Sequence, residues 1–214
     1  MAGEPEVFGA KGSVGVVVVP GLHGRDEYVR AVGRDLAAAG FPAAVVDLYG
    51  GAQPASYEEA APLRAKLTDE LVLERLEAGR DAVARKLIPH ARVGTLGFSL
   101  GGGYALFGAC RRRFHFAIDF YGKMERPDDL DGLGGPALLL LASDDDPVTP
   151  WTFAELLPTA ARLKKRVTVE LYPGAKHGFH RPGRPAHHAE AAAEAWKRTL
   201  SFLVEQRPGR PGPR

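Results

Sequence analysis

Three kinds of residue in this sequence could together carry out nucleophilic catalysis. Ser99 lies in the G-x-S-x-G segment at residues 97–101, three consecutive aspartates occupy 144–146, and His177 follows further along the chain. A serine hydroxyl attacks a carbonyl when a base takes its proton, and that base needs an acid to orient it. The spacing therefore indicates acyl-transfer chemistry, and any of the three aspartates could be the acid.

The sequence around Ser99 predicts a sharp turn between a strand and a helix. Residues 92–96 form a strand-like run, and a helix is predicted from about Gly101. Small neighbours permit such a turn, which lifts the central side chain above the sheet. The N-terminus of the helix offers free N–H groups to a developing oxyanion. The alternative is a glycine-rich turn that contains a serine by chance.

Strand-like apolar runs alternate with amphipathic stretches along most of the chain. This alternation predicts an α/β fold with a doubly wound, mostly parallel sheet, and the aspartates and His177 then follow the C-terminal ends of strands, where such sheets place their sites. Ser56 and Thr149 are expected to cap helices, and the last strand is expected near the sheet edge. The strands are predicted at residues 15–19, 43–47, 92–96, 116–120, 137–141 and 166–172, and the helices at 26–39, 56–66, 70–87, from 101, from 149 and at 186–206.

Composition excludes several classes of protein. The chain has 214 residues, one cysteine and a formal net charge of +2, so neither a disulfide scaffold nor a nucleic-acid-binding protein is indicated. No apolar run is long enough to span a membrane, and no signal peptide is visible, so a cytoplasmic location is expected. A single domain is predicted over residues 1–206, followed by a disordered Arg/Pro/Gly tail at 207–214.

The sequence resembles the dienelactone hydrolase family of α/β-hydrolases over roughly residues 14–203. The resemblance implies the α/β-hydrolase fold, with Ser99 as the nucleophile, Asp146 as the acid and His177 as the general base. It selects Asp146 because the family's acid lies four residues before the proline that Pro150 matches. The matching segments are residues 16–24, 40–49, 97–102, 146–150 and 172–179.

Two positions depart from the family pattern. Many members use cysteine as the nucleophile, whereas this chain has Ser99, which depends on His177 for proton removal. The lactone-cleaving members carry a glutamate where this chain has Gly21, so the activation tied to that glutamate does not carry over. Ordinary serine-esterase chemistry is expected, and dienelactone itself is not assured as the substrate.

Other residues are expected to complete the site. The backbone N–H groups of Leu22 and Leu100 are predicted to form the oxyanion hole, with His23 as the alternative to Leu22. Tyr121 and Arg181 match family positions near the substrate, and Arg181 could hold an acidic group, although both could equally be rim residues. No metal site or cofactor is expected.

The predicted function is that of a serine hydrolase which cleaves small carboxylic esters or lactones through an acyl-enzyme. Between residues 47 and 92 the chain holds one crossover helix and one short helix, at 56–66, which leaves no room for a large lid, so a shallow, open site for a small molecule is expected. A small peptidase or thioesterase would use the same triad, and a non-catalytic binding protein on this fold is a further alternative. No nucleic-acid or membrane partner is expected, and the oligomeric state is left open.

Overall fold

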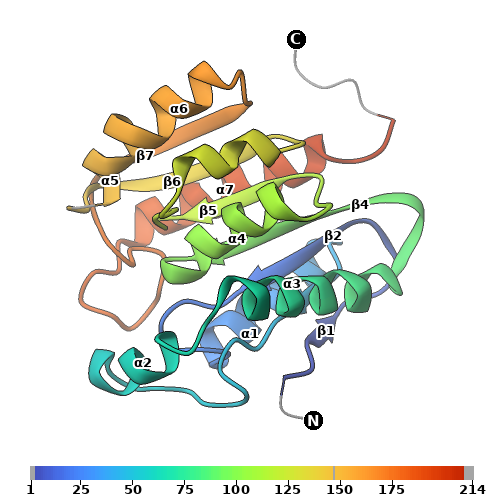
Figure 1. Ribbon diagram of the computed structural model, residues 1–214. Helices are drawn as coiled ribbons and strands as arrows, with labels where there is room; N and C mark the ends of the chain where they lie inside the picture. Colours follow the sequence, from blue (N-terminus) through green and yellow to red (C-terminus); the bar gives the residue numbers. More distant parts are fainter. Residues whose placement is uncertain (1–2, 147, 210–214) are drawn as a thin grey trace.

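The computed structural model describes residues 3–146 and 148–209, in which seven strands form one sheet (Figure 1). The strand order is β1-β3-β2-β4-β5-β6-β7; β1 runs antiparallel to β3, and the other neighbouring pairs are parallel. The predicted α/β fold is thus confirmed. The strands are β1 (Glu6–Phe8), β2 (Gly12–Val19), β3 (Ala43–Val45), β4 (Leu87–Phe98), β5 (Ala117–Phe120), β6 (Ala137–Asp144) and β7 (Val167–Lys176).

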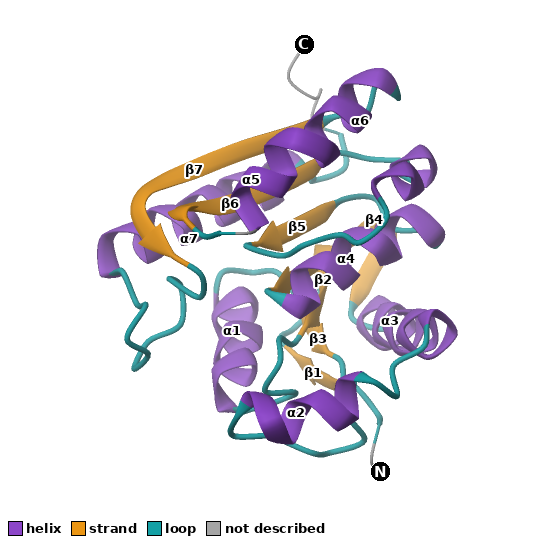
Figure 2. Cartoon of the chain, turned by 60° about the vertical axis from the view of Figure 1, so that its left-hand side comes forward, coloured by secondary structure: helices purple, strands orange, loops and turns teal. Residues whose placement is uncertain are grey.

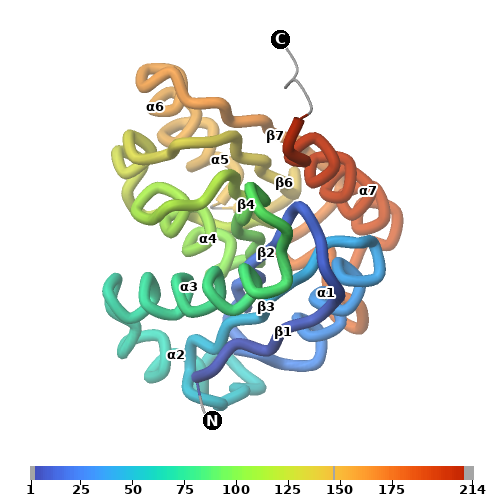
Figure 3. The backbone as a smooth tube through the Cα atoms, turned by 90° about the vertical axis from the view of Figure 1, so that its right-hand side faces the viewer, coloured from blue at the N-terminus to red at the C-terminus, as the bar shows by residue number. Residues whose placement is uncertain are grey.

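Helices cover both faces of the sheet (Figures 2 and 3). Helices α1 and α7 bury their apolar side chains on one face, and α3, α4 and α6 bury theirs on the other. The helices are α1 (Glu27–Ala38), α2 (Tyr57–Arg64), α3 (Asp69–Ala84), α4 (Leu100–Arg111), α5 (Val148–Trp151), α6 (Leu157–Arg162) and α7 (Ala189–Glu205), with a 3-10 turn at Pro127–Gly132 and a π-helical turn at Thr152–Leu156. The centre of the sheet is apolar and buried on both faces, since four consecutive valines of β2, Val16 to Val19, are fully buried.

Two predicted helix caps have different outcomes. The Ser56 hydroxyl accepts the Glu59 N–H at the start of α2, so that prediction is confirmed. The predicted cap at Thr149 is wrong, because Thr149 lies inside α5. Its hydroxyl donates instead to the carbonyl of Ala142 at 2.7 Å, which ties the helix to the end of β6.

The two edges of the sheet are formed by β1 and β7. The edge position of β7 agrees with its alternating sequence, whereas β1, with three residues, is too short to be detected as a strand from its pattern. Among the described residues, no helix combines the length and apolarity needed to span a membrane. The single domain over residues 1–206 stays a prediction, and residues 210–214 of the predicted tail lie outside the described part of the chain.

Candidate active site

Ser99 occupies a strained turn between β4 and α4. Its backbone has φ 54° and ψ −121°, a conformation that L-residues rarely adopt. The turn is held to the sheet by the Ser99 N–H, which donates to the carbonyl of Phe120 at 2.9 Å. Glycines are required around it, because a Cβ on Gly97 would lie 2.0 Å from the carbonyl oxygen of Gly101. The residue types of the G-x-S-x-G segment therefore follow from close backbone packing.

Two hydrogen bonds connect Ser99 to a histidine and an aspartate. The Ser99 Oγ lies 2.7 Å from His177 Nε2, and His177 Nδ1 lies 2.8 Å from an oxygen of Asp145. The Asp145 side chain is 3% exposed, whereas that of His177 is 44% exposed. A carboxylate on Nδ1 holds the proton there and leaves Nε2 free to accept the proton of the serine. The three groups have the geometry of a nucleophile, a base and an orienting acid.

The expectation that Asp146 supplies this acid is wrong. Asp146 is exposed one residue beyond Asp145, and it is Asp145 that contacts His177. Asp145 is the first residue after β6, which ends at Asp144, and it is the buried one of the three aspartates. Asp144 is also exposed, as expected, and accepts a hydrogen bond from Ser143.

The two predicted oxyanion donors lie beside Ser99. Leu100 is the first residue of α4, where an N–H has no acceptor within the helix. Leu22 lies in the loop after β2, and its N–H has no hydrogen-bond partner within residues 3–146 and 148–209. This loop passes close to the turn, because a Cβ on Gly21 would lie 2.9 Å from the carbonyl oxygen of Phe98 and 3.8 Å from the Ser99 Cβ.

A cavity of about 360 Å³ opens in front of Ser99. Tyr121 and Arg181, the two predicted substrate-binding residues, both line it. Tyr121 is 2% exposed and packs edge-on against the ring of His177, with the ring centres 5.2 Å apart. Arg181 pairs with Asp26, the N-cap of α1, and its guanidinium carbon lies 5.0 Å from the ring centre of Tyr28. Arg181 is therefore held at a fixed place in the cavity wall.

Among the lining residues that were not predicted from the sequence as substrate-binding residues, His23, Tyr28 and Arg184 have polar side chains. The Nδ1 of His23 lies 2.8 Å from the carbonyl oxygen of Pro54, and its Nε2 lies 3.0 Å from Arg184 Nη2. Because arginine can only donate, His23 Nε2 accepts, and the proton of the ring is on Nδ1. These contacts join segments that are distant in the sequence, so no local motif could have predicted them.

Two buried titratable groups lie near the site. Burial raises the pKa of Asp119 to about 7, although its hydrogen bond from the Gly122 N–H opposes the shift. Burial lowers the pKa of His180 to about 4, and its Nδ1 is hydrogen-bonded to the hydroxyl of Tyr28 at 2.8 Å. Cys110 is buried too, and burial raises the pKa of its thiol to about 12, which suits a core residue and not a nucleophile.

His187 and His188 make structural contacts near the start of α7. Among the described residues, no group of three or more His, Cys, Asp and Glu side chains is arranged to hold a metal ion. His188 instead caps α7, where its Nδ1 accepts the Ala191 N–H at 3.2 Å, and His187 Nδ1 lies 3.0 Å from the carbonyl oxygen of Phe179.

Residues 5–206 match the model of the dienelactone hydrolase family. The chain belongs to this family. A relative from Bradyrhizobium sp, named a probable 2-oxo-3-(5-oxofuran-2-ylidene)propanoate lactonase, is 32% identical over 207 residues, covering 88% of this chain and 82% of the relative. As a dienelactone hydrolase family member, the chain is a hydrolase that acts on ester or lactone bonds.

Solved structures agree with the fold of a dienelactone hydrolase. A dienelactone hydrolase-like promiscuous phosphotriesterase from metagenomic libraries superposes with a TM-score of 0.81 at 24% identity, covering 92% of this chain and 87% of that one. Dienelactone hydrolase from Anabaena variabilis gives a TM-score of 0.67 at 23% identity, covering 95% and 99% of the two chains. Both similarities show the α/β-hydrolase fold of the family.

Proposed function

We propose that this chain is a serine hydrolase that cleaves small carboxylic esters or lactones through an acyl-enzyme. The observation that carries the proposal is the hydrogen-bonded series Ser99–His177–Asp145 at the cavity. In it Ser99 is the nucleophile, His177 the general base and Asp145 the acid that orients the imidazole. The N–H groups of Leu22 and Leu100 bind the oxyanion.

The first half of the reaction forms the acyl-enzyme. Ser99 Oγ attacks the carbonyl carbon while its proton passes to His177 Nε2, and the carbonyl electron pair moves onto oxygen. The two N–H groups stabilise that oxyanion, and losing one such donor typically costs about 2.7–4 kcal/mol. When the tetrahedral intermediate collapses, the ester C–O bond breaks and His177 gives its proton to the departing alkoxide. Water then attacks the acyl group with His177 again as the base, which restores Ser99.

The cavity favours a substrate with an anionic group. Its charged lining residues are Arg181 and Arg184, with His23 and His177 beside them, and none of the lining residues is Asp or Glu. Arg181 is paired with Asp26, whereas Arg184 contacts the neutral ring of His23, so Arg184 keeps its charge available. The lactone in the name of the Bradyrhizobium relative also carries a carboxylate.

A substrate screen with two serine variants tests the proposal. The panel contains p-nitrophenyl acetate, a short lactone, an acyl thioester and a peptide p-nitroanilide, and a fluorophosphonate probe reports on the nucleophile. Ser99→Ala is expected to abolish ester and lactone cleavage and labelling, while Ser201→Ala, on the exposed side of α7, keeps both. Faster turnover of the thioester or the peptide would favour the thioesterase or peptidase alternative. A folded protein that neither cleaves nor labels would favour the binding protein.

A further inference from the structure

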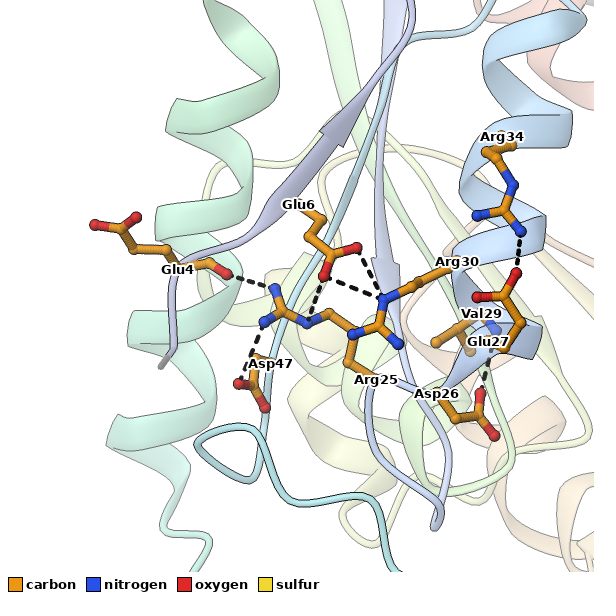
Figure 4. A network of polar contacts seen from close by, with 9 residues as sticks. All are labelled: Glu4, Glu6, Arg25, Asp26, Glu27, Val29, Arg30, Arg34 and Asp47. Atoms are coloured by element: carbon orange, nitrogen blue, oxygen red, sulfur yellow. Dashed lines mark hydrogen bonds and ion pairs between the residues drawn. The ribbon is translucent and has the colours of Figure 1, made fainter. Parts of the chain in front are cut away.

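Arg25 lies directly after the loop that carries the proposed oxyanion donor Leu22. This loop, residues 20–24, connects β2 to α1, and the Arg25 side chain is 11% exposed. Arg25 does not line the cavity but points to the other side of the loop, toward β1 and the end of β3 (Figure 4). A buried guanidinium of this kind needs partners for its charge.

Three groups surround the Arg25 guanidinium (Figure 4). Its Nη1 donates to the carbonyl oxygen of Glu4, its Nη2 lies 3.5 Å from Asp47 Oδ2, and its Nε lies 3.6 Å from a carboxylate oxygen of Glu6. Asp47 is fully buried, and its Oδ2 makes no hydrogen bond, so Arg25 compensates its charge. The other Asp47 oxygen accepts the Tyr49 N–H at 3.0 Å, which fixes the carboxylate to the segment after β3.

The same segment holds the loop at a second point. The His23 ring is hydrogen-bonded to the Pro54 carbonyl. Gly24, at φ 68°, packs directly against Ala52, because a Cβ on Gly24 would lie 2.7 Å from the carbonyl oxygen of Ala52. The loop is therefore attached on both sides of residue 24 to residues 47–54. On its other flank, a Cβ on Gly101 would lie 2.4 Å from the carbonyl oxygen of Pro20.

We propose that Arg25 is a positioning residue that holds the Leu22 N–H in place for the oxyanion. The inference rests on the proposed serine-hydrolase function. An oxyanion donor is effective when it is fixed before the reaction at hydrogen-bond distance from the developing charge, and a small displacement reduces the rate strongly. Leu22 lies in a turn closed by the Gly24 N–H, which donates to the Gly21 carbonyl at 3.1 Å, and the contacts of His23 and Arg25 attach this turn to the neighbouring segment.

Arg30 offers a matched control. It also pairs with Glu6, at 3.0 Å, but it lies on α1 and its contact does not involve residues 20–24. Figure 4 shows both arginines reaching the same carboxylate from different sides. Replacing either one by methionine keeps the apolar stem and removes the charge, and the two variants therefore differ in their attachment to the oxyanion loop.

The experiment compares Arg25→Met and Arg30→Met in kcat and KM for p-nitrophenyl acetate and in inhibition by phenylboronic acid. The boronate forms a tetrahedral anion on a serine and so measures binding of the oxyanion. Arg25→Met is expected to lower kcat about 10- to 100-fold, with KM changed less than about threefold and boronate affinity reduced in proportion to kcat/KM. Arg30→Met is expected to stay within about twofold of wild type in both respects.

A second variant keeps the test decisive if Arg25→Met folds poorly. Arg25→Met with Asp47→Asn removes both buried charges, so it is expected to regain thermal stability without regaining kcat. The inference is overturned if folded Arg25→Met, or the double variant, has wild-type kcat and boronate affinity, or if kcat falls while boronate affinity is unchanged. Ser99→Ala separates this result from failure of the proposed function, because ester cleavage that does not depend on Ser99 would overturn both.

Discussion

At the scale of single residues, the proposed orienting acid combines burial with a hydrogen bond to an exposed partner. Asp145 is nearly inaccessible, yet His177 Nδ1 reaches it at 2.8 Å from the loop after β7. Burial removes competing water from this carboxylate, so in the proposed mechanism its interaction with a His177 imidazolium is stronger than in solution. Asp146, in contact with solvent, cannot substitute for it at the same place.

Exchange of each aspartate for asparagine distinguishes these two neighbours. Asp145→Asn is expected to lower kcat for p-nitrophenyl acetate by about 10³- to 10⁴-fold, because the amide favours the wrong tautomer of His177. Asp146→Asn should change kcat by less than about twofold. Steady-state kinetics of both variants measure this difference. A large loss of kcat in Asp146→Asn together with an active Asp145→Asn would assign the acid to Asp146 instead of Asp145.

Two buried groups near the site have opposite effects on stability between pH 4 and 7. In the folded state, Asp119 has a pKa of about 7 and keeps its proton up to that pH. In the unfolded state, it loses the proton near pH 4. Its contribution to folding is therefore full below about pH 4 and is lost as the pH rises toward 7. His180, with its lowered pKa of about 4, disfavours folding as the pH falls from about 6.5 to 4.

Replacing each group isolates its share of this pH dependence. Relative to wild type, Asp119→Asn is expected to gain free energy of unfolding as the pH rises from 4 to 7, by up to about 1.4 kcal/mol per pH unit. Relative to wild type, His180→Gln should lose free energy of unfolding as the pH rises through the range in which His180 titrates. Urea unfolding at four pH values measures both, and variant curves parallel to the wild-type curve would show that neither group titrates there.

At the scale of elements, the turn between β4 and α4 is built by packing as much as by chemistry. The first turn of α4 lies against the end of β2, so that a Cβ on Gly101 would lie 2.4 Å from the carbonyl oxygens of Val19 and Pro20. The atoms that such a Cβ would meet belong to the backbone of β2 and the loop after it, so no side chain can rotate away to make room. The same contact brings the proposed oxyanion loop, residues 20–24, close to Ser99.

An alanine at this position is therefore expected to affect folding and activity together. Gly101→Ala should lower the free energy of unfolding by about 2 kcal/mol or more and reduce kcat at least tenfold. Gly134→Ala is the matched control, since a Cβ there meets nothing within 4 Å, and its unfolding should stay within about 0.5 kcal/mol of wild type. Chemical denaturation and esterase kinetics on the two variants test the prediction; equal behaviour would contradict it.

Much of this element-level organisation could be predicted from the sequence, because it follows from local patterns. The buried valines of β2 and the G-x-S-x-G turn have short-range signatures. Three features had no such signature: the brief strand β1, the choice between Asp145 and Asp146, and the contact of His23 with Arg184. Each depends on which side chain faces a distant segment, and spacing alone does not determine this.

At the scale of the whole molecule, the cavity is assembled from segments far apart in the chain. Its walls come from the loop after β2, the first turn of α1, the turn at Ser99, Tyr121 after β5 and residues 177–186. The proposed triad comes from the ends of β4, β6 and β7, at the edge of the sheet where parallel strands finish. The proposed triad lies at strand ends, whereas Arg184 lies in the loop before α7.

This separation predicts that charge selection can be changed without loss of turnover. Arg184→Met is expected to raise KM for p-nitrophenyl hemisuccinate about three- to tenfold, while kcat and the KM for neutral p-nitrophenyl butyrate change less than twofold. Arg207→Met is the matched control, because Arg207 packs over the ring of Phe41 and does not line the cavity. A parallel change of KM for both esters after Arg184→Met would show that Arg184 does not distinguish them by charge.

The segment between His177 and the start of α7 is one short continuous piece of chain, and it contains Arg181, Arg184, Pro185 and Ala186 of the cavity wall. Its two ends are fixed independently, by the histidine that joins the triad and by the cap of α7 at His188. Its exposed positions can be changed while Phe179, which is fully buried, and His188, the cap of α7, keep the segment in place. For evolution in nature or in the laboratory, this segment is therefore one place where the chemistry of the cavity wall can change without a change in the strands.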